Sequence, residues 1–299
     1  MITATISTYN REHYLPQVLD SLKRQSLSKD HFEIILVDNN SPGNTKEIAM
    51  NFKNDNPEIA FEYYLETNQG LSYGRNRGIK ESKGKYVTFI DDDAFLADDY
   101  LEVIYNYFEN NCNVVAIGSK ILLHYESVIP DWENKYLNSL LGFFNIGDNI
   151  MRFPKTDYPR GSNMSFKTSV FKEVGEFNVD LGRKGGNLAG SEEKDMFMRI
   201  YKHKDMLVDY IPNALVYHCV PIERTTTEFI KRQALGTGKS EAVRIKSEGI
   251  SSTIKRYVME GVKWGGSLAL FFIYLFKGQF PKGRMIVKFR WWVSKGLFQ

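Results

Sequence analysis

KYVTFIDDDA, residues 85–94, is the stretch around which the rest of the chain is organised. Residues 85–91 have the apolar character and length of a buried β-strand, and they run into three consecutive carboxylates, Asp91, Asp92 and Asp93. Adjacent carboxylates repel one another, so packing them together costs free energy unless a cation compensates. Their oxygens suit a divalent metal, Mg²⁺ or Mn²⁺. The alternative is a solvated acidic turn before a helix, whose N-terminus favours negative charge.

The segments around this stretch alternate between strand and helix patterns. Strands are predicted at 2–8, 32–38, 61–66, 85–91 and 113–123. Helices are predicted at 12–27, 44–53, 71–82 and 98–110. Alternation of apolar strands with helices predicts a parallel sheet covered on both faces.

The second half of the chain is less regular. It predicts a strand at 161–166, helices at 168–174, 191–203 and 225–248, and two short strands, 207–211 and 214–218, around Pro212. The glycine-rich segment GRKGGNLAG (182–190) is interpreted as a mobile lid, because glycine permits hinge conformations.

Polar clusters follow the first four predicted strands. They are STYNR (7–11), DNNS (38–41), ETNQG (66–70) and the three aspartates. Ligands of open α/β sheets bind outside the carboxyl ends of the strands, so these clusters predict one binding site. Asp38 can accept hydrogen bonds from a base or a ribose, or form an Asx turn. Arg75 can hold a diphosphate, or lie on the surface.

The composition is that of a globular protein, with 42% hydrophobic and 25% charged residues among 299. The two cysteines, Cys112 and Cys219, match no metal or redox spacing, so both are expected to be reduced. The chain enters a strand-like run at once, without a basic region before an apolar one, which argues against a signal peptide.

The C-terminal segment is strongly basic. Residues 250–299 hold nine Lys or Arg and one acid, Glu260, whereas residues 1–249 hold 30 bases and 35 acids. Its apolar run, WGGSLALFFIYLF (264–276), has 13 residues, short of the ~18–20 that span a bilayer. Aromatic and basic residues interleave after this run, and Lys and Arg also flank it, so residues 255–299 are expected to contact an anionic membrane surface. The alternative is packing in the core or in a homodimer; nucleic-acid binding is not expected.

Several motifs together resemble the family 2 glycosyltransferases with the GT-A fold. They follow the family's order and cover about residues 1–220: STYNR (7–11), VDNNS (37–41), TNQGLSYGRNRGI (67–79), FIDDDA (89–94), RGSNMSF (160–166), EVGEFN (173–178), SEEKDMFMRI (191–200) and VYH (216–218). The resemblance implies an α/β, Rossmann-like, mixed but mostly parallel sheet flanked by helices, with a C-terminal helical extension. It divides the chain into a GT-A domain, 1–222, with a nucleotide-binding half (1–118) and an acceptor-binding half (119–222), and the extension, 223–299.

The same resemblance assigns roles to residues of the site. Donor-binding residues would be Thr8, Tyr9, Arg11, Asp38, Asn68, Gly70, Arg75, Asp91, Asp92, Gly161 and Asn163, the first three lining the base pocket. Ligands of a Mn²⁺ or Mg²⁺ ion would be Asp93, Asp91 and His218, although a lone histidine at a strand end is more often structural. Without ligand, Asp93→Ala should raise the melting temperature slightly, because it removes one of three repelling carboxylates.

The catalytic base is predicted in SEEKD (191–195). The family usually has Glu-Asp there with the second acid as base, which makes Glu193 the candidate and Glu192 and Asp195 its neighbours. On a helix, Glu192 and Asp195 share a face, while Glu193 points about 100° away from Glu192. The alternative is an ordinary acidic helix start.

These assignments predict a metal-dependent inverting glycosyltransferase of hexosyltransferase type. It would move a sugar from a nucleotide-sugar donor, a UDP-sugar before a dTDP-sugar, to a hydroxyl of a glycan or lipid-linked acceptor in surface polysaccharide biosynthesis. Its expected location is cytoplasmic, peripheral on the inner face of the cell membrane. A glycine-rich, lysine-bearing loop after the first strand would favour a nucleotidyltransferase instead, but the loop STYNREHYL has no glycine. The non-enzyme alternative is a carbohydrate- or lipid-binding protein with a decayed site, which would not hydrolyse a sugar nucleotide.

Overall fold

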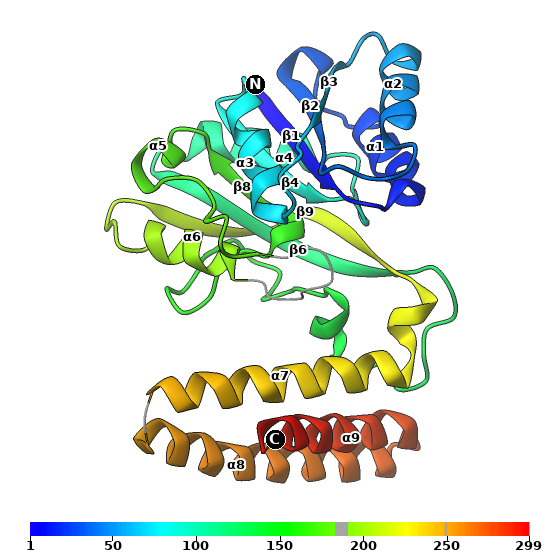
Figure 1. Ribbon diagram of the computed structural model, residues 1–299, viewed down its shortest axis with the longest axis vertical. Coiled ribbons are helices and arrows are strands. Elements are labelled where there is room, and N and C mark those ends of the chain that lie inside the picture. Colours follow the sequence, from blue (N-terminus) through cyan, green and yellow to red (C-terminus); the bar gives the residue numbers. More distant parts are fainter. Residues whose placement is uncertain (183–190, 249, 299) are drawn as a thin grey trace. The chain divides into compact units, whose positions relative to one another are not determined.

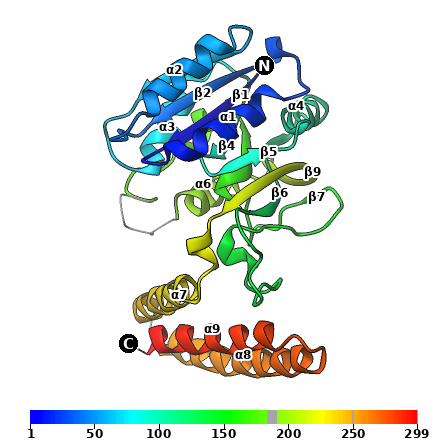
Figure 2. The same cartoon turned by 90° about the vertical axis from the view of Figure 1, so that its right-hand side faces the viewer.

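The structure, a computed structural model, describes residues 1–182, 191–248 and 250–298 (Figures 1 and 2). The predicted lid therefore lies, apart from Gly182, outside the described residues. The chain packs into two compact units, one of residues 1–122 and 144–218 and the other of residues 123–143 and 219–299. The units do not follow the expected boundary after residue 222, because residues 123–143 pack with the C-terminal helices.

Four parallel strands form one half of the sheet in the first unit, in the order β3-β2-β1-β4. They are β1 (Ile2–Thr8), β2 (Phe32–Asp38), β3 (Ala60–Leu65) and β4 (Tyr86–Asp91). Thr8 pairs with Asp38, and Ser7 with Asp91, so the carboxyl ends of these strands are level. Every residue of β2 is buried, as expected for a strand covered on both faces.

The helices of this half connect the strands as the sequence predicts. They are α1 (Leu15–Lys23), α2 (Thr45–Asp55), α3 (Leu71–Glu81) and α4 (Tyr100–Asn110), with 3-10 turns η1 (Glu12–Tyr14) and η2 (Lys29–His31). Helix α3 packs closely on β1 because it carries glycine at Gly74 and Gly78. A Cβ at Gly78 would lie 2.2 Å from Thr5 Oγ1, and one at Gly74 would lie 2.9 Å from Ser7 Oγ. These glycines fix how α3 presents Arg75.

The other half of the sheet contains antiparallel pairings, in agreement with the mixed, mostly parallel sheet that the resemblance implies. Strand β8 (Met164–Lys167) lies between β4 and β6 (Val114–Tyr125) and runs antiparallel to both. The predicted strand 161–166 is thus wrong in its first residues, which form the 3-10 turn η4 (Gly161–Asn163). The remaining elements are β5 (Ala94–Leu96), β7 (Met151–Arg152), β9 (Leu207–Val220), α5 (Val170–Val174) and α6 (Glu192–Ile200).

Strand β9 is one continuous strand, not the two short strands predicted around Pro212. It pairs with the three-residue strand β5, which the sequence did not predict, and this pairing sets Ala94 opposite His218. The pairing therefore brings His218 next to the three aspartates.

The second unit consists of three helices and the 123–143 segment. The helices α7 (Thr227–Glu248), α8 (Ile250–Phe276) and α9 (Phe280–Leu297) lie side by side in Figure 1. The 3-10 turns are η3 (Asn138–Leu141) and η5 (Ile222–Thr225). Trp132, Leu141, Ile230 and Met285 belong to the apolar core of this unit.

Helix α8 is longer than the apolar run 264–276, which was judged too short to span a bilayer. The run 264–276 is the second half of a 27-residue helix. The segment Thr253–Phe276 is long and apolar enough to cross a membrane, by length and composition. Core helices of soluble proteins can be equally long and apolar, but they are mostly buried. In an apolar 18-residue stretch of this segment, only 11% of the residues are buried.

Candidate active site

Thr8, Asp38 and Asp91, three of the predicted site residues, end β1, β2 and β4, so the candidate site lies at the carboxyl ends of these strands. Two groups of charged side chains occupy this edge. The first joins Arg11 to Asp92, Asp93 and His218, and the second joins Arg75 to Asp91, Glu192 and Glu193. All of these residues belong to the first unit.

Asp92 and Asp93 are buried, and an arginine compensates their charge. Arg11 Nη1 lies 3.1 Å from Asp92 Oδ1 and 2.5 Å from Asp93 Oδ2. Thr8 Oγ1 donates to Asp92 Oδ2 over 2.8 Å. Burial raises the pKa of Asp92 to about 7, although Arg11 and the Thr8 hydroxyl oppose the shift. The structure thus sets Arg11 between the two aspartates. The resemblance assigned Thr8, Tyr9 and Arg11 to the base pocket. Of these three residues, Thr8 and Arg11 contact the aspartates, and Tyr9 is exposed.

The predicted metal ligands are only partly brought together. His218 Nε2 lies 3.5 Å from Asp93 Oδ1, while Asp91 Oδ1 lies 3.8 Å from Arg75 Nη2. Within residues 1–182, 191–248 and 250–298, no group of three or more His, Cys, Asp or Glu side chains could hold a metal ion by itself. A carboxylate and an imidazole still fit a divalent ion that takes its other ligands from water and substrate phosphate.

Arg75 has a different environment from the one predicted. Its side chain is buried, with Nη1 2.9 Å from Glu192 Oε1 and Nη2 3.3 Å from Glu193 Oε1. The sequence placed Arg75 at the phosphates of the nucleotide. In the structure the guanidinium instead binds the two acids at the start of α6, because a buried arginine requires compensating carboxylates.

Glu192 and Glu193 differ in exposure. The side chain of Glu192 is 3% exposed, and its Oε2 also accepts a hydrogen bond from the Ser191 backbone N–H over 3.0 Å. The side chain of Glu193 is 24% exposed. Burial raises the pKa of Glu193, and the nearby carboxylates of Glu192 and Asp91 raise it further, against the effect of Arg75. Glu193 therefore has the accessibility and the raised pKa of a general base.

Gly161 lies directly under this carboxylate. A Cβ at that position would lie 1.9 Å from Glu193 Oε1 and 2.5 Å from Arg75 Nη2. Only glycine leaves room for both groups, so Gly161 positions the acid. Asn163, which was predicted with Gly161 to bind the donor, is fully buried. Its amide donates to the carbonyls of Lys120 and Ala214, and its Oδ1 accepts from Tyr100.

Asp195 pairs with Arg199, and not with the group formed by Arg75, Asp91, Glu192 and Glu193. Its Oδ2 accepts a hydrogen bond from Arg199 Nε, one turn further along α6, over 2.9 Å. Arg199 in turn donates to the carbonyls of Val174, Gly175 and Glu176. The neighbouring candidate for the base therefore anchors α6 to the preceding loop.

Asp38 makes a local turn contact of the kind the sequence suggested, while its contact with a base or ribose stays a prediction. Its Oδ1 accepts from the backbone N–H of Ser41, three residues further along the chain, over 2.8 Å. Its Oδ2 accepts from Tyr63 Oη over 2.9 Å. A carboxylate has about four lone-pair sites, so Asp38 retains capacity for a ligand N–H. Tyr63 was missed by the sequence analysis, because only the pairing of β2 with β3 brings it there.

Asn39 is a second residue that the sequence analysis missed. Its Nδ2 donates to the carbonyls of Glu66 and Asn68, and its Oδ1 accepts from the Gly70 N–H over 2.8 Å. Gly70 has φ +142°, a conformation that favours glycine, at the start of α3. Asn39 thus holds the loop that carries two predicted donor-binding residues, and its place in VDNNS was the available signal.

Comparison with known proteins identifies the family. Residues 3–175, more than half of the chain, match the model described as glycosyl transferase family 2. The chain belongs to glycosyl transferase family 2. This confirms the family inferred from the motifs, and with it a glycosyltransferase on the GT-A fold.

This glycosyltransferase is 27% identical over 245 residues to the glucosyl-dolichyl phosphate glucuronosyltransferase of Haloferax volcanii, covering 81% of this chain and 76% of that protein. Three other relatives are matched over less than half of their own length. One is the poly(ribitol-phosphate) beta-glucosyltransferase of Bacillus spizizenii, which is 30% identical over 117 residues; the match covers 39% of this chain and 18% of that protein.

Solved structures share the fold of this glycosyltransferase. The mannosyltransferase PcManGT from Pyrobaculum calidifontis, in complex with GDP-Man and Mn²⁺, has a TM-score of 0.64 at 16% identity and covers 99% of this chain and 86% of that chain. TarS 1-349 of S. aureus, in complex with UDP-GlcNAc, has a TM-score of 0.57 at 18% identity and covers 79% and 66%.

Proposed function

We propose that this family 2 glycosyltransferase transfers a sugar from a nucleotide-sugar donor to an acceptor hydroxyl with inversion at the anomeric carbon, and that Glu193 is the general base. The observation that carries the proposal is the position of Glu193, a partly exposed carboxylate with a raised pKa beside Asp91 at the carboxyl edge of the sheet. Inversion needs one base and no covalent nucleophile.

The residues around Glu193 support this role. Its carboxylate removes the proton of the acceptor hydroxyl as the hydroxyl oxygen forms a bond to the anomeric carbon and the bond to the nucleoside diphosphate breaks. Arg75 holds the carboxylate in place from one side. Arg75 is therefore a positioning residue, and Gly161 leaves the space that the side chains of Glu193 and Arg75 occupy.

Asp93 and His218 would hold a divalent metal, Mn²⁺ or Mg²⁺. When bound, such an ion supplies positive charge that stabilises the departing diphosphate. Asp91 faces Arg75 and Glu193, which fits a contact to the donor better than a place among the metal ligands. Arg11 bridges Asp92 and Asp93, and its guanidinium, which does not lose its proton, opposes the rise that burial causes in the pKa of Asp92.

The raised pKa of Glu193 predicts the acidic limb of the pH profile. A base must be ionised, so kcat/KM should rise as the pH increases through the raised pKa of Glu193, above the ordinary glutamate value of about 4.3. Stability should change in the opposite direction. The folded protein binds this proton more tightly than the unfolded chain, so the contribution is complete below the ordinary value and is lost as the pH rises through the folded pKa.

Two measurements check this pH dependence: kcat/KM of the wild type, and the free energy of unfolding of wild type and Glu193→Gln between acidic and neutral pH. The variant should lack the part of the stability change that comes from Glu193. An acidic limb at the ordinary glutamate pKa, or identical stability profiles for the two proteins, would contradict the assignment.

For the donor base we propose uracil, with thymine as the alternative. Asp38 can accept a hydrogen bond from the imide N–H of a pyrimidine while it holds Ser41 and Tyr63. Titration of the full chain with nucleoside diphosphates and Mn²⁺ should find UDP or dTDP tighter than GDP. A GDP affinity at least tenfold tighter than both, about 1.4 kcal/mol, would overturn this assignment.

We further propose a glycan or lipid-linked acceptor and a role in surface polysaccharide biosynthesis, with the enzyme on the cytoplasmic face of the membrane. The motif resemblance and the mostly exposed apolar window of α8 support this placement. The test of the enzyme class needs no acceptor: metal-dependent hydrolysis of a sugar nucleotide is expected, and its absence with every donor tried would favour a binding protein.

A further inference from the structure

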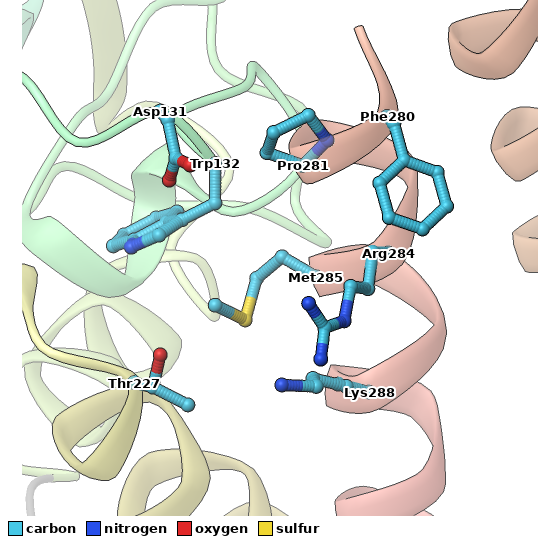
Figure 3. A pocket seen from close by; sticks show the side chains of 8 residues that line it. All are labelled: Asp131, Trp132, Thr227, Phe280, Pro281, Arg284, Met285 and Lys288. Carbon is cyan, nitrogen blue, oxygen red and sulfur yellow. The ribbon is translucent and has the colours of Figure 1, made fainter.

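A pocket of about 200 Å³ opens in the second unit, to which none of the residues discussed as catalytic belongs (Figure 3). It lies between the 123–143 segment, the first residue of α7 and the first half of α9. Eight side chains line it: Asp131, Trp132, Thr227, Phe280, Pro281, Arg284, Met285 and Lys288. Sites that bury a drug-sized ligand measure ~300–1,000 Å³, so this pocket suits a small head group rather than a nucleotide sugar.

The pocket carries excess positive charge on one wall. Arg284 and Lys288 lie one turn apart on α9, and both extend into the pocket in Figure 3. In the part of the chain that the structure describes, neither forms an ion pair with a carboxylate. Asp131 is the single acid of the lining and lies on the opposite side. The N-terminus of α7, at Thr227, adds the partial positive charge of a helix start.

Apolar side chains supply part of the lining, and two contacts anchor the segments that carry it. Trp132 is buried, and its Nε1 donates to the Thr225 carbonyl over 3.0 Å. Lys282 Nζ lies 3.7 Å from Glu133 Oε2, which ties the start of α9 to the segment that carries Trp132. The walls of the pocket are therefore held before any ligand arrives, which lowers the cost of binding.

The pocket residue Phe280 contacts α8, since its ring centroid lies 5.9 Å from that of Phe271, and α8 carries exposed apolar side chains. Phe280, which lines the pocket, is 46% exposed, and Phe276, four residues earlier at the end of α8, is 86% exposed. Phe272 and Ile273 of the same helix are also exposed. A soluble protein seldom leaves large apolar residues clustered in water without a partner. Basic residues beside an apolar face are what an anionic lipid requires.

We propose that this pocket binds the phosphate group of a membrane lipid, with Arg284 and Lys288 on the phosphate and the hydrocarbon chain along Phe280 and Phe276. Arg284 and Lys288, which pair with no carboxylate among the described residues, recognise the anion, and the aromatic side chains of Phe280 and Phe276 distinguish a lipid phosphate from a free one. The proposal does not rest on the catalytic assignment, because binding can be measured without donor or turnover.

The test is calorimetric titration of the full chain with soluble phosphates that carry or lack a hydrocarbon chain. Dihexanoyl phosphatidic acid and geranyl phosphate, both below their aggregation limits, represent acyl and prenyl lipids, and inorganic phosphate represents the free ion. At least one lipid phosphate should bind ten times or more tightly than inorganic phosphate, and the tighter of the two identifies the source. Inorganic phosphate binding as tightly as both lipids, or no binding of either lipid, overturns the proposal.

Matched variants locate the binding. Arg284→Gln with Lys288→Gln should weaken lipid phosphate binding about tenfold or more. Lys277→Gln with Lys295→Gln removes the same charge from exposed positions outside the pocket and should leave the affinity near wild type. Equal losses in both double variants would mean diffuse attraction and overturn the pocket assignment.

The acid of the pocket gives a test of opposite sign. Asp131→Asn removes a negative charge, so an anionic ligand should bind as tightly as before or more tightly. Weaker binding in this variant would mean that the ligand needs an acceptor at Asp131, which contradicts an anion site. Unchanged melting temperatures of the three variants, in the absence of ligand, confirm that their folds are intact.

Discussion

Glu193→Gln is expected to lower turnover by ~10²–10⁴, the usual contribution of general acid–base catalysis. Glutamine keeps the shape of the side chain and a hydrogen bond to Arg75, but it cannot take a proton. Donor affinity should change little, because Glu193 is expected to contact the acceptor. Single-turnover rates at saturating donor and acceptor measure the chemical step directly.

Two neighbours on α6 provide matched controls. Glu192→Gln removes a charge from a buried pair with Arg75, so it should mainly lower stability, by about 1–3 kcal/mol. Asp195→Asn breaks a partly exposed pair with Arg199, which contributes about 1 kcal/mol or less, and should leave turnover near wild type. If Glu192→Gln is inactive and Glu193→Gln active, the assignment of the base is wrong by one residue.

Asp93→Ala should lose metal-stimulated turnover by ~10²–10³, the scale for removing one group that stabilises developing charge. Asp93 is the carboxylate beside His218, and His218 alone is a poor site for Mg²⁺ or Mn²⁺. The measurement is donor turnover against Mn²⁺ concentration, with Asp98→Ala as control, since Asp98 is an exposed acid that pairs with Arg24. Full activity of the wild type in EDTA, or unchanged metal dependence in Asp93→Ala, would refute the metal role.

The same variant reverses an expectation drawn from the sequence. Three aspartates in a row suggested that removing one would raise the melting temperature. In the structure Arg11 bridges Asp92 and Asp93, so removal of Asp93 takes away an ion-pair partner instead of a repelling charge. We therefore expect a small decrease in melting temperature. The sequence could not identify Arg11 as the compensating cation, because the partners are 82 residues apart.

The parallel half of the fold could be predicted because its signals are local. The apolar runs at β1, β2 and β4 and the intervening helical spacing are complete within about ten residues each. Strand β5 has three residues and exists through its pairing with β9, and Pro212 lies inside a strand that neighbours support. Such elements depend on long-range pairing, which a single sequence does not contain.

The position of the site was predictable, and its internal contacts were not. Strand ends in a parallel sheet converge by geometry, so Asp38 and Asp91 were expected at one edge. Which cation meets which acid depends on side-chain conformations. Arg75 lies with Glu192, 117 residues away, and no local pattern indicates this pair. Asn163 was predicted to bind the donor, but in the structure its side chain is fully buried and forms hydrogen bonds within the protein interior.

The most direct test of the central claim follows the anomeric configuration of the sugar released or transferred from a UDP-α-sugar, by proton NMR at early times, in wild type and Glu193→Gln. The account predicts that the β-anomer forms first in the wild type, with Mn²⁺ present, and that its formation slows by ~10²–10⁴ in the variant. An α-anomer as the first product, or equal rates in the two proteins, would contradict inverting transfer with Glu193 as the base.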